Sequence, residues 1–332
     1  MERARIQGSF VTRMVAAGLA ALALLCGAGV RAESYPDKAV RFIVPFPPGG
    51  GADIVARLLA RKLAERWGQQ VVVDNRAGAG GVIGTDLAAA ATPDGYTMLL
   101  GTLGTLSVNP HLYGEMKVDP ARDFAPVTQL VNVQFALLAN PAFPPNTVGE
   151  LIALARAKPG TINYSSSGSG GGPHLAAELF NSLAGVSTVH VPYKGSGPGM
   201  QDLLAGQVSM TFDSLVQALP QVRAGKLKAL AVLGTERARL LPSIPTMAEA
   251  GVPGYSFTNW FGLVVPKATP PALVARLHAD VVAVMRHPEV REQFAEMGAD
   301  VVGNSPQAFG EVIANDSQKW ARLIRQAGIR AN

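Results

Sequence analysis

The chain has 332 residues, 48% of them hydrophobic, and a formal net charge of +5. Residues 1–32 contain four arginines and one glutamate, so the rest of the chain carries a net charge of only +2. No run of Lys and Arg and no basic stripe with interleaved aromatic residues occurs, which argues against a nucleic-acid-binding protein, and the remaining roughly 300 residues suffice for two domains.

The N-terminus has the pattern of a secretory signal peptide. Three arginines among the first 13 residues precede an apolar run at 14–28, which is short for a membrane span, and Val30 and Ala32 are small residues that suit cleavage. The alternative is a retained membrane anchor. The single cysteine, Cys26, follows Leu25, where a lipoprotein signal would have a small residue. We expect a mature chain that begins near Glu33 and has no thiol or disulfide.

The stretch from Phe42 to Arg66 predicts a buried strand, a glycine-rich loop and an amphipathic helix. Prolines end the apolar run, three glycines follow at 49–51, and apolar residues then recur at helical spacing. The first amides of a helix have no internal partner, and the helix dipole favours negative charge there. Loop and helix together therefore suit an anion, although a tight turn without a ligand is the alternative.

A second copy of this arrangement lies at 163–183. The polar tract at 165–172 offers hydroxyls and bare amides but no charge. It runs into a helix that has Pro173 at its first position and Gly185 just after its end. Gly/Ser tracts are often flexible linkers, but this one sits inside a strand–helix unit, which favours a binding loop.

Between these units we expect strands at 71–73 and 96–100. The loop at 78–81 fails the dinucleotide-binding fingerprint, because Ile83 stands where the third glycine belongs. The second of these strands is followed by another polar-glycine loop, Gly101 to Thr105. In parallel sheets ligands bind beyond the carboxyl ends of the strands, so the glycine loops should share one edge.

The chain further predicts two α/β lobes with a hinge. Apolar, extended segments at 124–138 and 257–265 are expected to cross between the lobes. We predict a signal peptide at 1–32, a discontinuous first domain at 33–135 and 257–332, and a second domain at 136–256. Each domain is expected to be a mostly parallel sheet flanked by helices. In the second domain, a helix is expected at 200–205 and a strand at 208–212.

Five motifs in this order resemble one known family: PFPPGGGADIVAR, NRAGAGGVIGTDLAAAATPDGYTMLLGT, NYSSSGSGGGPHLAAELF, VPYKGSGPGMQDLLAGQVSMTFDS and PSIPTMAEAGVPGY. The family is the Bug receptors, the substrate-binding proteins of tripartite tricarboxylate transporters in Gram-negative bacteria. The resemblance covers essentially the whole mature chain. It implies a two-domain Venus flytrap in the periplasm that captures a small carboxylate, such as an amino acid, a di- or tricarboxylate or an aromatic acid, and delivers it to transporter subunits.

The resemblance also implies a monomer without cofactor or metal, and a ligand held mainly by backbone amides, small hydroxyls and waters. Carried over by position, the implied ligand-binding residues are Phe46, Pro48, Gly49, Gly50, Asp53, Gly81, Thr102, Ser165, Ser166, Ser167, Gly168, Gly170, His174, Tyr193, Lys194, Gly195 and Asp213.

Two other classes of function compete with this interpretation. An exported serine hydrolase could use Ser166, His174 and Asp213 as a triad, but the chain contains no Gly-x-Ser-x-Gly elbow. The other is a ligand sensor that serves a signalling partner without transport. The sequence does not distinguish such a sensor from a transport receptor. A metal site is disfavoured because the five histidines show no close pair in the sequence.

Three charged residues at the expected cleft leave alternatives open. Asp53 either favours the helix dipole or orders the glycine loop or a bridging water. Lys194 either pairs with the ligand or is solvated. Asp213 either takes a ligand amine or hydroxyl, or caps the next helix. Because the amides should dominate, we expect Gly50→Val and Gly168→Val to weaken binding strongly and Lys194→Ala to weaken it modestly.

Overall fold

The computed structural model describes residues 35–114 and 116–327, so the predicted signal peptide lies outside the described residues. By its contacts the chain separates into residues 1–38 and residues 39–332, and the fold below is that of the second unit alone. In the described ranges no helix is both long and apolar enough to cross a membrane.

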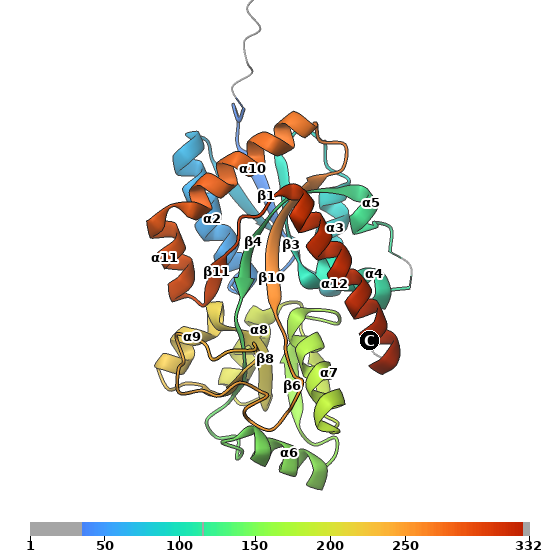
Figure 1. Cartoon of the computed structure of the whole chain (residues 1–332), viewed down its shortest axis with the longest axis vertical. Coiled ribbons are helices and arrows are strands. Elements are labelled where there is room, and N and C mark those ends of the chain that lie inside the picture. Colours follow the sequence, from blue (N-terminus) through green and yellow to red (C-terminus); the bar gives the residue numbers. More distant parts are fainter. Residues whose placement is uncertain (1–34, 115, 328–332) are drawn as a thin grey trace, which may run out of the picture. The chain divides into compact units, whose positions relative to one another are not determined.

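Two sheets organise this unit, one in each lobe (Figure 1). The first has the order β11-β4-β10-β3-β1-β2, and the second has the order β7-β6-β8-β5-β9. The strands of the first sheet are β1 (Val40–Val44), β2 (Val71–Asn75), β3 (Thr97–Thr102), β4 (Phe124–Val133), β10 (Asn259–Pro266) and β11 (Ala299–Val301). The strands of the second sheet are β5 (Phe135–Ala139), β6 (Asn163–Ser166), β7 (Val189–Pro192), β8 (Met210–Ser214) and β9 (Lys228–Val232).

Both sheets are mixed, and the fold class of two α/β lobes is confirmed. In the first sheet β1 pairs in parallel with β2 and β3, and in the second β6 pairs in parallel with β7 and β8. However, β10 runs antiparallel to β3 and β4, and β5 runs antiparallel to β8 and β9. The sheets are therefore less parallel than predicted, because β5 and β10, the strands that follow the two crossings, run antiparallel to their neighbours.

Helices flank both sheets. Those of the first lobe are α2 (Gly51–Trp67), α3 (Val82–Ala89), α10 (Pro271–Arg286), α11 (Pro288–Glu296) and α12 (Pro306–Ala327), with the short η1 (Ala79–Gly81), η2 (Gly104–Val108), α4 (Asn109–Leu112) and α5 (Pro120–Asp123). Those of the second lobe are α6 (Val148–Ala157), α7 (Gly172–Ala184), α8 (Ser196–Leu204) and α9 (Leu215–Arg223). Figure 1 shows α2, α10 and α11 to one side of the first sheet and α3 and α12 to the other.

Helix α2 illustrates how the sequence specifies these elements. Val55, Leu59 and Leu63 recur every four residues and are fully buried. The helix ends at Gly68, which has φ 65° and donates its N–H to the carbonyl of Ala64. Truncating one of the buried leucines to alanine should lower the free energy of unfolding by about 2–5 kcal/mol, so this face anchors the loop that precedes the helix.

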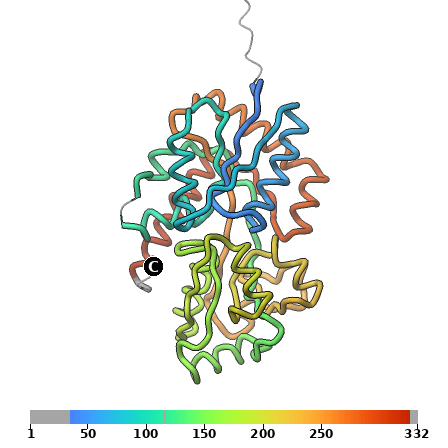
Figure 2. Tube along the Cα trace, turned by 180° about the vertical axis from the view of Figure 1, so that it is seen from behind, coloured from blue at the N-terminus to red at the C-terminus, as the bar shows by residue number. Residues whose placement is uncertain are grey.

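The two crossings between the lobes lie side by side (Figure 2). Strand β4 ends at Val133 and β5 begins at Phe135, so the first crossing is a single residue long. The chain returns into β10, whose first residue, Asn259, pairs with Val133. Adjacent crossings of this kind are suited to hinge motion of one lobe against the other. The predicted domain bounds at 135 and 257 stay a prediction.

Helix α8 begins four residues before the start that the sequence predicts. Gly197, Pro198 and Gly199 favour a loop by propensity, but they lie in the first turn of the helix. There the amides have no internal acceptor, so a proline costs no hydrogen bond. The earlier start brings Ser196 to the carboxyl edge of the second sheet.

Candidate functional site

Four helices begin around one small cavity between the two sheets. Residues from the first turns or N-caps of α2, α7, α8 and α9 line this cavity. The four N-cap residues are Gly50, Gly171, Gly195 and Ser214, and none of them makes a side-chain capping hydrogen bond. The positive ends of four helix dipoles therefore converge on one place, which favours an anion. In α9 the first amide, on Leu215, already donates to the Gln134 carbonyl.

The cavity has a volume of about 40 Å³, which is room for only a few water molecules. Its lining contains no lysine or arginine, and its one charged side chain is Asp213. A ligand of more than a few heavy atoms must therefore displace the walls or enter an opened cleft. The lining residues are Phe46, Gly50, Gly51, Ala52, Thr102, Phe135, Ser167, Gly172, Pro173, Ser196, Asp213, Ser214, Asn259 and Phe261.

The glycine loop of the first lobe packs directly on the second lobe. A Cβ atom on Gly51 would lie 2.5 Å from Ser214 Oγ, so only glycine fits there without a shift. Gly195 in turn lies against the Pro47 ring, where an added Cβ would clash with its Cδ. Gly50 is different, because its φ is −81° and the nearest atom to an added Cβ, the Gly197 nitrogen, is 3.6 Å away.

These glycine positions separate the reasons behind the valine variants. At Gly50 the backbone angle does not require glycine and the nearest protein atom to an added Cβ is 3.6 Å away, so weaker binding by Gly50→Val depends on blocking the ligand itself and stays a prediction. A close approach to the other lobe occurs at Gly51. At Gly168 the backbone does require glycine, because its φ is +110° and an added Cβ would lie 3.2 Å from the Tyr193 carbonyl oxygen. The structural reason for expecting an effect of Gly168→Val therefore holds.

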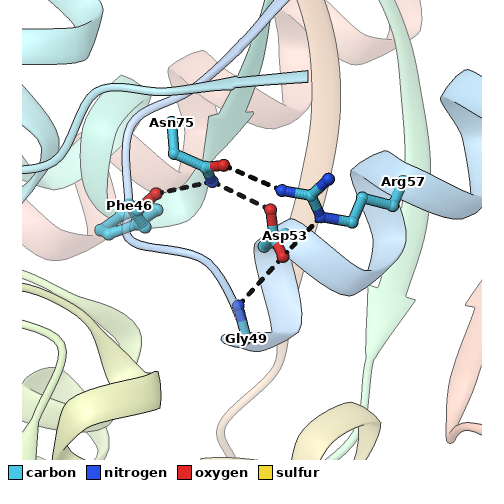
Figure 3. A network of polar contacts seen from close by, with 5 residues as sticks. All are labelled: Phe46, Gly49, Asp53, Arg57 and Asn75. Carbon is cyan, nitrogen blue, oxygen red and sulfur yellow. Dashed lines mark hydrogen bonds and ion pairs between the residues drawn. The ribbon is translucent and has the colours of Figure 1, made fainter. Parts of the chain in front are cut away.

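Asp53 orders the first glycine loop (Figure 3). Its carboxylate accepts hydrogen bonds from the Gly49 amide at 3.0 Å, Arg57 Nε at 2.9 Å and Asn75 Nδ2 at 2.9 Å, and the Asn75 amide also donates to the Phe46 carbonyl. Burial alone would raise the pKa of Asp53, but these hydrogen bonds outweigh it and hold the pKa below its usual range. Of the two alternatives for Asp53, the structure thus favours ordering of the loop.

The serine-glycine loop is held by two histidines. Ser166 Oγ lies 2.5 Å from His190 Nε2 and accepts a hydrogen bond from the Gly168 amide at 3.1 Å. The Gly170 amide donates to His174 Nδ1, also at 3.1 Å. Both serine and histidine are thereby used to shape the loop, and Ser166 bonds His190 rather than His174, so the hypothetical triad does not form.

The two histidines stack on each other, with ring centroids 4.1 Å apart and an interplanar angle of 13°. The sequence, in which they are 16 positions apart, gave no indication of this pair, because α7 and β7 bring them together from separate elements. Burial and then repulsion from His190 lower the pKa of His174 to about 3, and burial lowers that of His190 to about 4. Among the described residues no cluster of three potential metal ligands occurs.

Asp213 lies at the end of β8, buried at the bottom of the cleft. It accepts hydrogen bonds from the Ser214 amide at 2.6 Å, Gln217 Nε2 at 2.7 Å and the Ser196 hydroxyl. Burial nevertheless raises its pKa to about 6, because all of these donors are neutral. The Ser214 hydroxyl also lowers this pKa slightly, although its Oγ lacks the geometry of a hydrogen bond.

The structure brings only part of the predicted set to the cavity wall. Phe46, Gly50, Thr102, Ser167 and Asp213 line it. Tyr193 instead donates to Asp202 at 2.5 Å, and Lys194 is exposed, which agrees with a solvated lysine. Ligand contacts by the following residues, which lie outside the wall in this structure, stay predictions: Pro48, Gly49, Asp53, Gly81, Ser165, Ser166, Gly168, Gly170, His174, Tyr193, Lys194 and Gly195.

Sequence reasoning missed several wall residues. Ser196 and Ser214 are helix starts, and Asn259 is a polar residue within an apolar crossing strand. Asn259 carried a usable signal, because a polar side chain inside such a run is buried and needs a partner. The wall residues outside the two predicted glycine-loop units are Phe135, Ser196, Ser214, Asn259 and Phe261, whereas Gly51, Ala52, Gly172 and Pro173 lie within those units.

A larger hollow of about 750 Å³ lies on the first lobe, between α12 and the segment from η2 to α5. Its wall is mostly apolar and includes Leu106, Tyr113 and Ile313. No predicted binding residue reaches it, and it lies beside one sheet only. The cleft is the stronger candidate because helix starts and buried polar groups converge there.

Known proteins are similar to this chain along most of its length. A family model described as the tripartite tricarboxylate transporter family receptor matches residues 55–329. Protein BugT of Bordetella pertussis is 39% identical over 304 residues, which are 91% of this chain and 93% of BugT. The solved structure of R. palustris Rpa4515 with adipate has a TM-score of 0.87 at 38% identity, covering 89% of this chain and 99% of that one. The periplasmic binding protein BugD has a TM-score of 0.86 at 36% identity, with the same coverage.

Proposed function

The chain belongs to the receptor family of tripartite tricarboxylate transporters, and we propose that it captures a small carboxylate between its lobes for delivery to a membrane transporter of that type. We place this capture in the periplasm, where BugD works as a binding protein. Rpa4515 holds adipate, a dicarboxylate, which supports an acid as the ligand class here. As members of a receptor family, such chains bind their ligands and do not transform them.

One observation carries the proposal: four helices whose N-cap residues make no side-chain hydrogen bond begin at one cavity that no lysine or arginine lines. A carboxylate bound there can accept hydrogen bonds from several backbone amides, and the cavity wall has no lysine or arginine to pair with it. Because α2 belongs to the first lobe and α7, α8 and α9 to the second, the ligand bridges all four starts only when the lobes are together. Ligand should therefore favour the closed state over the open one.

A binding experiment tests this directly. Isothermal titration with a panel of mono- and dicarboxylates, adipate included, should give one equivalent of a bound acid, and the same acid should raise the melting temperature. Gly51→Ala introduces a Cβ 2.5 Å from Ser214 Oγ and should weaken binding about tenfold or more. Gly149→Ala makes the same chemical change in α6, where the nearest atom to the added Cβ is Thr147 Oγ1 at 3.9 Å, and serves as the matched control.

Two results would overturn the assignment of the cleft. One is that no acid of the panel binds, and the other is that Gly51→Ala binds the acid as tightly as Gly149→Ala does. Delivery is tested separately, with vesicles that contain the membrane subunits of a tripartite tricarboxylate transporter. Uptake of the bound acid should require the receptor. Uptake that does not depend on it would favour a ligand sensor instead.

A further inference from the structure

Three buried side-chain polar atoms at the cleft have no hydrogen-bond partner, Asn259 Oδ1, Gln217 Oε1 and Ser214 Oγ, and the first two can only accept. Asn259 Oδ1 belongs to a side chain that is 4% exposed and lines the cavity. Gln217 Oε1 belongs to a side chain that is 8% exposed, and it lies 4.0 Å from the position of a Cβ on Gly50, at the cavity edge. A buried acceptor without a donor costs stability, so two of them at one cavity call for an explanation.

The orientation of Gln217 identifies the atom that is left over. Its Nε2 donates to Asp213 Oδ2 at 2.7 Å, so the amide oxygen is the end that faces the glycine loop of the first lobe. Asn259 approaches from the other side, beside Gly172, whose added Cβ would lie 3.3 Å from the Asn259 amide nitrogen. The two acceptors therefore come from α9 and β10, on either side of the helix starts that suit a carboxylate.

The negative charge of Asp213 in the cavity wall also favours a ligand that carries a hydrogen-bond donor. Asp213 lines the cavity, and the groups that donate to it are the neutral Ser196, Ser214 and Gln217. A ligand made only of carboxylates would bring a second negative charge beside it and leave both amide oxygens unpaired. A site built to accept a hydrogen bond rejects the analogue that lacks the donor, because its own polar groups then stay buried and unsatisfied.

We propose, on the basis of the receptor function proposed above, that the cleft selects carboxylates that also carry a hydrogen-bond donor, a hydroxyl or an ammonium group. This donor binds Asn259 Oδ1 on one side of the helix starts, or Gln217 Oε1 beside Asp213 on the other, while the carboxylate binds at the helix starts. The ligand class is thus hydroxy acids and amino acids, in preference to plain mono- or dicarboxylates.

Matched acids test the preference. Succinate, malate and aspartate share one carbon skeleton and differ only in a hydrogen, a hydroxyl or an ammonium group on one carbon. Titration of each should give malate or aspartate an affinity at least tenfold above succinate. The same three-way series is then run on the skeleton that binds best in the carboxylate panel. Malate as the tightest ligand identifies a hydroxyl as the donor, and aspartate as the tightest identifies an ammonium group drawn by Asp213.

Asn259→Leu ties the preference to the proposed atoms. It removes an unpaired buried oxygen, so the melting temperature without ligand should stay the same or rise, while the ratio of affinities between the donor-bearing and plain acid should fall about tenfold. Gln217→Leu provides a second variant from another element. Thr211→Val is the control, because the Thr211 hydroxyl is buried but already donates to the Ser165 carbonyl at 2.9 Å. It should lower the melting temperature and leave the ratio unchanged.

The outcomes separate this inference from the function it rests on. Plain acids that bind as tightly as their hydroxy and amino derivatives, or a ratio that survives in both Asn259→Leu and Gln217→Leu, overturn the donor preference but leave the carboxylate receptor intact. A panel in which no carboxylate binds overturns the receptor function, and the preference with it.

Discussion

A Cβ atom on Gly50 would lie 3.8 Å from the Cβ of Ser196, although the two residues belong to different lobes. This separation equals the mean Cβ–Cβ distance in disulfides, and Gly50 has a φ of −81°, which any residue can adopt. The chain has a single cysteine, Cys26, within the predicted signal peptide. A Gly50→Cys/Ser196→Cys pair should therefore form a selective lock across the cleft.

The lock tests whether ligand entry needs the lobes to part. Oxidised Gly50→Cys/Ser196→Cys should associate with the carboxylate at least about tenfold more slowly than the same protein after reduction, because the closed cavity holds only about 40 Å³. Stopped-flow fluorescence before and after treatment with a reductant measures both rates on one sample. Equal rates would show that the ligand enters without opening.

The stacked His174 and His190 predict acid sensitivity. Both have a pKa lowered by burial, to about 3 and about 4, whereas the unfolded chain takes up protons near 6.5. Below pH 6.5 the unfolded state therefore binds more protons, and the stability that the neutral pair contributes is lost as the pH falls toward 4. His190→Phe keeps the stacking surface, so urea unfolding of this variant should depend less on pH between 4 and 6.5.

The exposed His287 supplies the control for that experiment. His287→Asn should keep the pH dependence of the wild type. A His190→Phe variant whose unfolding free energy falls with acid as steeply as that of the wild type would show that the pair is not responsible.

Asp213 predicts the opposite dependence on pH. Its pKa rises from 3.8 to about 6 on folding, so the folded state binds the extra proton, and the associated stability is present below about pH 4 and lost as the pH rises through 6. A difference of this size corresponds to about 3 kcal/mol. Relative to the wild type, Asp213→Asn should gain stability between pH 4 and pH 8 by up to that amount.

Urea unfolding at several pH values measures this gain, and Asp300→Asn at an exposed position is the matched control. The comparison uses the change with pH and not the stability at one pH, because the new amide cannot accept all the hydrogen bonds that the carboxylate accepts. A constant difference between Asp213→Asn and the wild type would contradict a raised pKa at this site.

Local pattern was sufficient to predict much of the fold. The glycine loop before α2 and the polar tract before α7 were found from their own residues, because apolar spacing and helix-start chemistry are local signals. The start of α8 was placed too late, since proline and glycine in a first turn imitate a loop. The antiparallel strands were missed because direction within a sheet depends on the path of the chain after each crossing.

The candidate site was harder to predict, because its wall is made by contacts between lobes. Gly50 and Gly51 are adjacent in one motif, yet only Gly51 touches Ser214, and no pattern in the sequence distinguishes them. The stack of His174 on His190 likewise depends on where β7 lies beside β6. Asp213 was implied by the resemblance, whereas Gln217, whose amide donates to it, and Asn259 were not.

Because Asp53 orders the first glycine loop, its removal should destabilise the protein more than removal of Arg57. Its side chain is buried, whereas the Arg57 side chain that pairs with it is 53% exposed. Removing Asp53 takes a charged acceptor away from the half-buried Asn75 side chain and the exposed Gly49 amide. Because hydrogen bonds to a charged group are stronger than neutral ones, Asp53→Ala should lower the unfolding free energy by about 1.5–3 kcal/mol. Arg57→Ala removes a largely solvated partner and should cost less than about 1 kcal/mol.

The same two variants should differ in ligand binding. Without the bond from Gly49 to Asp53 the glycine loop is no longer fixed at the start of α2, so the carboxylate must order it on binding. We expect Asp53→Ala to lower affinity about tenfold and Arg57→Ala to change it less than threefold, as measured by isothermal titration of folded samples. If Arg57→Ala weakens binding and stability as much as Asp53→Ala does, the ion pair and not the bond to the loop amide is what holds this loop in place.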